Sequence, residues 1–273
     1  MLNIDISKFA DKLPDINVLY EDIAQPSARK IGLALETLTE FGYSLTLPIK
    51  LRSEKARLNF EKSIKLMAEE LSTTSENDII PSPSEISVPI MEQLPYTNND
   101  ELRSLFVRLL VKSATLRTVH MAHPSFINVI KNLSEDEAKI LDNLSCYKNG
   151  TLFPLIQYKY INTDSYKIAY RHVAAIDAFC LNFPKNFPLY FDNLSSLGII
   201  QGGYDKIITD LDRYVKIDEA HGPRYTFTPD EGWEVSYDKG FYQITDYGTQ
   251  FISACVIDLP RTIEGRILAS SSL

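Results

Sequence analysis

Hydrophobic residues recur at helical spacing along the first third of the chain. One set steps by four, three, four and three residues and comprises Ile31, Leu35, Leu38, Gly42 and Leu45. A second set has similar steps and comprises Phe60, Ile64, Met67 and Leu71. This spacing places each set on one face of a helix. We therefore predict two amphipathic helices that pack on each other, the first over residues 29–47.

Proline and capping residues punctuate the next stretch. Four prolines within residues 81–95 favour extended segments around one short helix at 84–94. Asn98, followed three residues later by Glu101, indicates the start of another helix, which continues with an apolar stripe of helical period.

Two further helix starts follow. His123-Pro124 opens a short helix, since proline suits the first helical turn and the histidine side chain can cap it. Ser134 and Glu137 match the S-x-x-E pattern of a capping box, in which each side chain bonds the backbone N–H of the other residue. We predict a helix after each signal.

The pattern changes after Gly150. Residues 151–161 are rich in aromatic and β-branched side chains, which favours a strand, and we interpret Gly202-Gly203 as a turn. The other predicted elements are a helix at 166–179, a helix at 188–198 closed by Gly198, a short strand at 199–200, a helical segment at 203–215, strands at 225–227, 233–237 and 241–245 with a break at 238–240, and a last helix at 247–257.

The order of these elements predicts an α+β fold, mainly α. It consists of a helical N-terminal part followed by a winged-helix-like C-terminal part. We place a helical domain at residues 15–145 and a winged-helix-like α+β domain at 146–260. Residues 261–273 are a tail, either disordered or of artificial origin, and enter no functional argument.

Charge argues against DNA as a partner. The 273-residue chain has a formal charge of −8 and a pI of about 5.1. Residues 200–260 contain five basic and eleven acidic side chains, and the helix that would act as recognition helix, 188–198, carries Asp192 and no Lys or Arg. Phosphate contacts need basic side chains. The winged-helix-like part therefore favours a protein partner.

The chain shows signs of a cytoplasmic location. Its cysteines, Cys146, Cys180 and Cys255, are odd in number and widely spaced, which favours reduced thiols. The N-terminus lacks the apolar core of a signal peptide. The uncharged stretch at 41–49 has nine residues, whereas a membrane-spanning helix needs about 20.

The candidate chemical sites have structural explanations. His120 and His123 have metal-ligand spacing, but Pro124 disrupts the helix that would align them, and no third ligand is near in sequence. Cys180 and His172 are eight residues apart, about two turns on a helix, too far for a nucleophile pair. We therefore predict no metal, no cofactor and no enzyme activity.

Carboxylates near helix starts have the same kind of explanation. Glu21 and Asp22 are adjacent and diverge, and the positive end of the helix dipole accounts for them. The 29–47 helix leaves one alternative open. Its apolar face includes the small residues Gly32 and Gly42, so it could lodge at a bilayer surface, although core packing explains the same face.

Several blocks of sequence resemble the Abi-alpha (abortive infection alpha) family of bacterial proteins. These blocks are LYEDIAQP at 19–26, the proline-spaced run at 80–97, HPSF at 123–126 and LSEDEAKIL at 133–141. Val107-Arg108 departs from the family pattern, which has smaller or amide residues there. The family supplies no catalytic residues. Its motif residues, which we interpret as holding the fold, are Tyr20, Glu21, Asp22, Gln25, Pro26, His123, Pro124, Ser134 and Glu137.

The resemblance implies defence against phage. We expect an abortive-infection protein that acts by binding a phage component, a host protein or itself. The alternatives are an effector that perturbs membranes through the 29–47 helix, at the membrane periphery on activation, and a winged-helix regulator.

Overall fold

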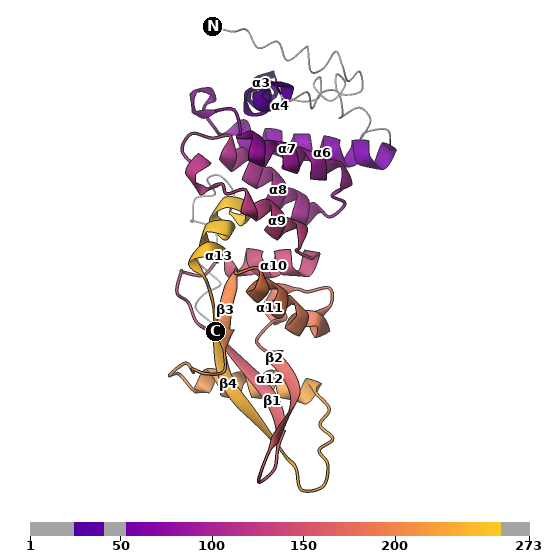
Figure 1. Ribbon diagram of the computed structural model, residues 1–273, viewed down its shortest axis with the longest axis vertical. Coiled ribbons are helices and arrows are strands. Elements are labelled where there is room, and N and C mark those ends of the chain that lie inside the picture. The colour runs from indigo at the N-terminus through magenta and orange to yellow at the C-terminus, as the bar shows by residue number, and fades with distance from the viewer. Residues whose placement is uncertain (1–24, 41–52, 258–273) are drawn as a thin grey trace. The chain divides into compact units, whose positions relative to one another are not determined.

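The computed structural model describes residues 25–40 and 53–257 (Figure 1). Predictions on other residues, including Tyr20, Glu21, Asp22 and the 261–273 tail, lie outside this range. By its contacts the chain divides into two units. Unit 1 comprises the described residues up to Ala138 and from Phe251 on, and unit 2 comprises Lys139–Gln250. The boundaries 15–145 and 146–260 stay predictions, because contact clusters and folding domains are different quantities.

Unit 1 is built from helices. They are α3 (Gln25–Ala34), α4 (Glu36–Glu40), α6 (Glu54–Ser72), α7 (Ser84–Gln93), α8 (Asp100–Ser113), α9 (Ser125–Lys131) and the π-helical turn η7 (Ile252–Val256). Short 3-10 turns include η2 (Leu94–Tyr96) and η3 (Val119–Met121). The unit borders fall at α10 (Glu135–Leu144) and α13 (Asp246–Phe251).

Helices α6 and α8 form the centre of unit 1. Helix α6 packs on α3, α8 and η2, and α8 also packs on α7, α9 and η7. The buried side chains between them include Ile31, Phe60, Met67, Leu71, Ile90 and Leu109. The predicted apolar faces of the first two helices are thus buried where the structure describes them.

A lysine ties the first described helix to α6. Lys30 Nζ donates to the carbonyl oxygens of Leu71, at 3.0 Å, and Ser72, at 2.9 Å. These carbonyls end α6, where the helix dipole favours a cation. Ile31 and Ala34 of α3 are 1% and 0% exposed. Apolar burial and this cap together fix α3 on α6.

The helix starts predicted from Asn98, His123-Pro124 and Ser134 are confirmed, the first of them with a shift of one residue. The N-cap of α8 is Asn99, whose side chain accepts from the Leu102 N–H at 2.9 Å, so the cap predicted at Asn98 is shifted by one. The capping box before α10 is formed: Glu137 Oε2 accepts from the Ser134 N–H at 2.6 Å, and Ser134 Oγ accepts from the Glu137 N–H at 3.3 Å.

Unit 2 contains a four-stranded antiparallel sheet and two helices. Its strands are β1 (Phe153–Ile161), β2 (Tyr166–Val173), β3 (Ile200–Gly203) and β4 (Glu234–Ile244), in the order β2-β1-β4-β3, and its helices are α11 (Phe187–Ser196) and α12 (Asp212–His221). Helix α12 packs on the sheet through a core of Ile156, Tyr158, Val173, Ile208, Tyr214 and Ile217. Helix α11 contacts β2 and β3.

The helix predicted at 166–179 is wrong, because this segment forms β2. The Asn162 side-chain oxygen accepts from the backbone N–H groups of Asp164, at 3.0 Å, and Ser165, at 2.7 Å. This Asx turn reverses the chain, so Tyr166 comes to lie opposite Ile161 on β1. Hairpin pairing therefore overrides the helical pattern.

The break predicted at 238–240 is also wrong, because these residues lie inside β4. Lys159 on β1 forms an ion pair with Asp238, across the strands. A Cβ on Gly240 would lie 2.2 Å from the Gly203 carbonyl oxygen, so glycine is needed where β3 approaches β4. Residues 225–227, predicted as a strand, form no regular element.

The helix predicted at 203–215 begins only at Asp212. Gly202 and Gly203, interpreted as a turn, belong to β3 and pair with Tyr242 and Phe241. Pairing with β4 keeps the chain extended there. The loop that follows is fixed where the Ile208 N–H donates to the Tyr214 hydroxyl at 2.8 Å.

The fold is α+β and mainly α, as predicted. The winged-helix detail is not confirmed, since it required a helix where β2 lies and a broken hairpin where β4 is continuous. The predicted strand at 151–161 and the helices at 84–94, 188–198 and 247–257 are present with shifted ends. Gly198, with φ +74°, follows α11 as expected of a helix-closing glycine.

Gly248 in α13 provides a test of the packing. A Cβ there would lie 2.1 Å from the Ile199 carbonyl oxygen, and backbone cannot yield cheaply. We predict that Gly248→Ala lowers the free energy of unfolding by about 3 kcal/mol, measured by urea denaturation. The control is Gly150→Ala, where φ is +82° and no atom lies within 4 Å, and where we expect about 1 kcal/mol. An equal loss at both sites would contradict the packing argument.

Candidate functional site

The two histidines with metal-ligand spacing lie before α9, and one of them caps its start. His120 lies in η3, and His123 Nδ1 accepts from the Ser125 N–H at 3.1 Å, at the start of α9. Within residues 25–40 and 53–257, no group of three or more His, Cys, Asp or Glu side chains is placed to hold a metal ion. His123 therefore has a capping contact, which explains its position before Pro124.

The family-motif residues that the structure describes lie at helix starts. Gln25 and Pro26 begin α3, and His123 and Pro124 precede α9. Ser134 and Glu137 cap α10, as described above. The contacts of His123, Ser134 and Glu137 are those of helix capping.

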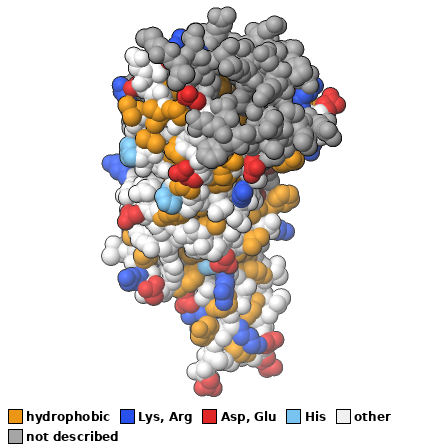
Figure 2. Space-filling view, turned by 45° about the horizontal axis from the view of Figure 1, so that its top comes forward, with side chains coloured by type: hydrophobic (Ala, Val, Ile, Leu, Met, Phe, Trp, Pro, Cys, Tyr) orange, Lys and Arg blue, Asp and Glu red, His pale blue; other side chains and the backbone are white. Residues whose placement is uncertain are grey.

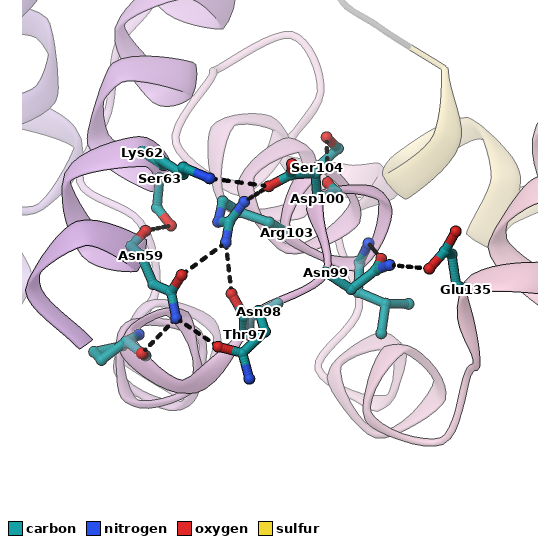
Figure 3. A network of polar contacts seen from close by, with 12 residues as sticks. Asn59, Lys62, Ser63, Thr97, Asn98, Asn99, Asp100, Arg103, Ser104 and Glu135 are labelled. Carbon is teal, nitrogen blue, oxygen red and sulfur yellow. Dashed lines mark hydrogen bonds and ion pairs between the residues drawn. The ribbon is translucent and has the colours of Figure 1, made fainter. Parts of the chain in front are cut away.

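A buried arginine organises the densest polar network in the described part of unit 1 (Figure 3). Arg103 on α8 is 3% exposed. Its Nη2 donates to Asn59 Oδ1 on α6 at 3.2 Å and to the Thr97 carbonyl oxygen at 2.7 Å, and its Nη1 contacts the carboxylate of Asp100. One guanidinium thus connects α6, the segment after η2 and the first turn of α8.

Asn59 extends this network to the segment before α8. Its Nδ2 donates to the Pro95 carbonyl oxygen and to Asn98 Oδ1, both at 3.1 Å, and Asn59 itself is 7% exposed. Asn99 then donates to Glu135 Oε2 of α10 at 2.8 Å. Because a buried polar group is costly without partners, these bonds specify how the segments pack.

The electrostatics of Arg103 are asymmetric. The guanidinium is buried, whereas the side chain of Asp100, which lies against it, is 73% exposed. Burial lowers the pKa of Arg103. Among the described residues, Arg103 Nε is a buried side-chain polar atom for which the structure shows no hydrogen-bond partner. The network therefore holds a charge whose main partners are neutral oxygens.

Two more cations on α8 bind backbone carbonyls of η7. Arg108 Nη1 donates to the Val256 carbonyl oxygen at 3.0 Å, and Lys112 Nζ donates to that of Ser253 at 3.2 Å. Arg108 also pairs with Glu70 on α6 at 3.2 Å. Cations suit the carbonyl end of the η7 turn. Arg108, which departs from the family pattern, thus has a structural contact.

A second constellation lies in unit 2, around His172. Its Nε2 lies 3.1 Å from Asp192 Oδ1 on α11, and its Nδ1 lies 3.2 Å from the Tyr204 hydroxyl. A carboxylate only accepts, so we assign the ring proton to Nε2, and the Tyr204 hydroxyl then donates to Nδ1. The imidazole also stacks on Phe191, with ring centroids 4.2 Å apart.

The backbone at His172 is strained. Its φ of +54° lies in the left-handed region, which non-glycine residues adopt at an energetic cost. Tyr204 compensates, because its hydroxyl accepts from the His172 N–H at 3.1 Å and lies 3.4 Å from the Ile156 carbonyl oxygen. Burial lowers the pKa of His172 and raises the pKa of Tyr204 to about 12. Both groups are neutral at neutral pH.

Cys180, which was considered as a partner of His172, lies outside β2. Cys180 follows the 3-10 turn η4 (Asp177–Phe179), is exposed and has φ +50°. His172 lies on β2, so the two residues do not share the helix on which their spacing was measured. The ring nitrogens of His172 are occupied by Asp192 and Tyr204.

The sequence patterns missed an exposed apolar stripe beside α12. Figure 2 shows hydrophobic side chains among charged ones on the face in view, and isolated ones are ordinary. Ile207, Leu211 and Val215, however, are spaced by four residues and are 54%, 46% and 43% exposed. The sequence showed the helical spacing of Ile207 and Leu211 but not the exposure of these side chains.

The fold and these networks indicate the general class of the protein. The chain is a mainly helical α+β protein whose polar networks fix helices and strands. No helix in the described part of the chain has the length and apolar character needed to cross a bilayer. The abortive infection alpha family matches residues 53–255, most of the chain. The chain therefore belongs to that family, as its sequence blocks indicated.

The other comparisons add little. No curated protein matches the chain. A solved structure of an uncharacterized protein from the hydrocarbon-degrading marine bacterium Alcanivorax borkumensis SK2 is similar over 52% of this chain and 96% of its own, at 16% identity. Its TM-score of 0.29 is too low to support an argument.

Arg103 gives a direct test of the unit 1 network. Replacing it by alanine leaves Asn59 Oδ1 and the Thr97 carbonyl without their donor, so we predict a loss of about 3 kcal/mol in the free energy of unfolding. Asp100→Asn is the control, and we expect a loss of under about 1 kcal/mol because this side chain is 73% exposed. Similar losses in the two variants, measured by urea denaturation, would refute the network's assigned role.

His172 predicts a pH dependence of stability. Its pKa is lowered in the folded protein from the ordinary value of 6.5, so the unfolded chain takes up a proton first as pH falls. Stability should therefore be full above about pH 6.5 and decrease below it. His172→Gln should reduce this slope, leaving the part due to His221, whose pKa burial also lowers. An unchanged slope in denaturation curves from about pH 7 to 5 would exclude His172 as a cause.

Proposed function

We propose that this protein is an antiphage defence protein of abortive-infection type that acts by binding a phage component or a partner protein. The observation that carries the proposal is the family match over residues 53–255. It supplies the biological setting. The contacts of the chain support the mode of action that we propose.

Binding explains the surface of unit 2 better than chemistry does. Apart from Arg103 Nε, the polar groups named in the two networks bond one another, whereas Ile207, Leu211 and Val215 remain exposed on a charged surface. Exposed apolar groups at regular spacing are typical of protein contacts. Helix α11 contains no Lys or Arg, which argues against a regulator that grips DNA with it.

Membrane perturbation receives less support. Ile31, Ala34, Leu35 and Leu38 are buried in unit 1, and Lys30 bonds the end of α6. Exposing this apolar face would cost the contacts that hold α3 in place. We therefore propose a cytoplasmic protein whose defence action goes through protein contacts.

The test is a phage challenge of bacteria that express the chain. Abortive infection predicts a lower phage yield, survival of the culture at low phage-to-cell ratios and its collapse at high ratios. Escape phages would then be selected and sequenced, and the product of the mutated gene should co-purify with the protein. Cells that carry Gly248→Ala provide the control for loss of the folded chain.

The proposal fails if phage yield is the same with and without the folded protein across a broad phage panel. It also fails in its binding form if escape mutations fall in genes whose products do not bind the chain. Protection that leaves infected cells alive at high phage-to-cell ratios would contradict the abortive type of defence.

A further inference from the structure

We infer that the stripe Ile207–Leu211–Val215 is a self-association surface, through which two copies of the chain pair with their α12 helices antiparallel. The occupant is a second copy because the charges beside the stripe complement themselves under a two-fold rotation. This inference concerns the purified chain and does not depend on the defence role.

Two residues of the stripe lie on one side of the start of α12. Leu211 is the N-cap residue of α12, and its carbonyl accepts from the Tyr214 N–H at 3.1 Å, so Val215 lies one turn further on the same side. Ile207 is exposed in the loop that precedes α12, next to Ile208, whose N–H donates to the Tyr214 hydroxyl. The buried side of the helix carries Tyr214, Ile217 and His221 instead. The side chains of the stripe therefore do not belong to the core side of α12.

The same flank of the stripe carries opposite charges at its two ends. Asp212 and Lys216 are both exposed, and neither forms an ion pair among the residues that the structure describes. On a helix they lie about 100° and 140° around the axis from Leu211, and Val215 lies at about 40°. Both side chains thus border the apolar surface on one side.

An antiparallel pair brings these charges together. If the midpoint between Leu211 and Val215 lies on the two-fold axis, Lys216 of one copy and Asp212 of the other are offset by about 3 Å along the helix axis. The contact occurs twice by symmetry. A parallel pair would place this flank of the two copies on opposite sides of the contact, so Asp212 and Lys216 would not meet across it. The charge order therefore selects the antiparallel arrangement.

The size of the stripe sets the strength of association. Three apolar side chains per copy form a small interface, which is typical of transient complexes. We expect a monomer–dimer equilibrium that shifts with protein concentration. Such an association would bring copies together where the protein accumulates.

Sedimentation equilibrium of the full chain, at protein concentrations of about 1 to 500 µM, tests whether the apolar stripe forms the dimer contact. Val215→Asp should raise the dimer dissociation constant by about a hundredfold, because the side chain is buried once from each copy. Val235→Asp is a matched control: Val235 on β4 is also 43% exposed but is not part of the stripe. It should leave the constant within about twofold.

Charge exchange tests the antiparallel geometry. Lys216→Glu places like charges opposite each other, and so does Asp212→Lys, so each variant alone should be a monomer over this range. Mixed in equal amounts they restore both pairs, and the mixture should form a heterodimer of near wild-type affinity. Circular dichroism melts confirm that each variant is folded.

Three results would overturn the inference: a wild-type chain that stays monomeric over the whole range, equal effects of Val215→Asp and Val235→Asp, or folded charge variants that fail to associate when mixed. Phage protection by a monomeric, folded Val215→Asp chain would separate the two proposals, since defence would then stand without self-association.

Discussion

The arrangement of unit 1 depends on keeping one buried guanidinium bonded. Arg103 is 3% exposed, and a cation in that position is tolerated only where oxygens surround it. Asn59 from α6, Thr97 from the segment after η2 and Asp100 from α8 supply those oxygens (Figure 3). Apolar packing brings these elements together, but many packings bury similar area. The directed bonds of Arg103 select one of them.

Unit 2 uses the same principle with a different residue. His172 adopts a left-handed backbone, and Tyr204 bonds both its N–H and its ring. Asp192 binds the other ring nitrogen, so β2, α11 and the loop after β3 meet at one imidazole. A histidine with tyrosine and carboxylate partners is a usual candidate for a catalytic site. Their polar atoms are already used within the fold, which directs attention to the exposed side of α12.

Local rules predicted most of unit 1 and less of unit 2. The spacing that begins at Phe60 and the Ser134–Glu137 capping box act within one helix, so the sequence was sufficient to find them. The Arg103 network was missed because Asn59 and Arg103 are far apart in sequence. In unit 2, the pairing partner decides the structure: residues 166–173 become β2 because the Asn162 turn returns them to β1.

We propose that the family-motif residues hold the fold and that an exposed surface makes the contacts needed for defence. A scan of all single substitutions, read once for protein abundance in the cell and once for phage protection, tests it most directly. We expect that substitutions at Arg103, Ser134, Glu137 and Gly248 lower phage protection only in proportion to the loss of protein abundance. A separate set of exposed positions should lower protection at full abundance. Abundant but inactive variants at the buried network, with no exposed set, would contradict the account.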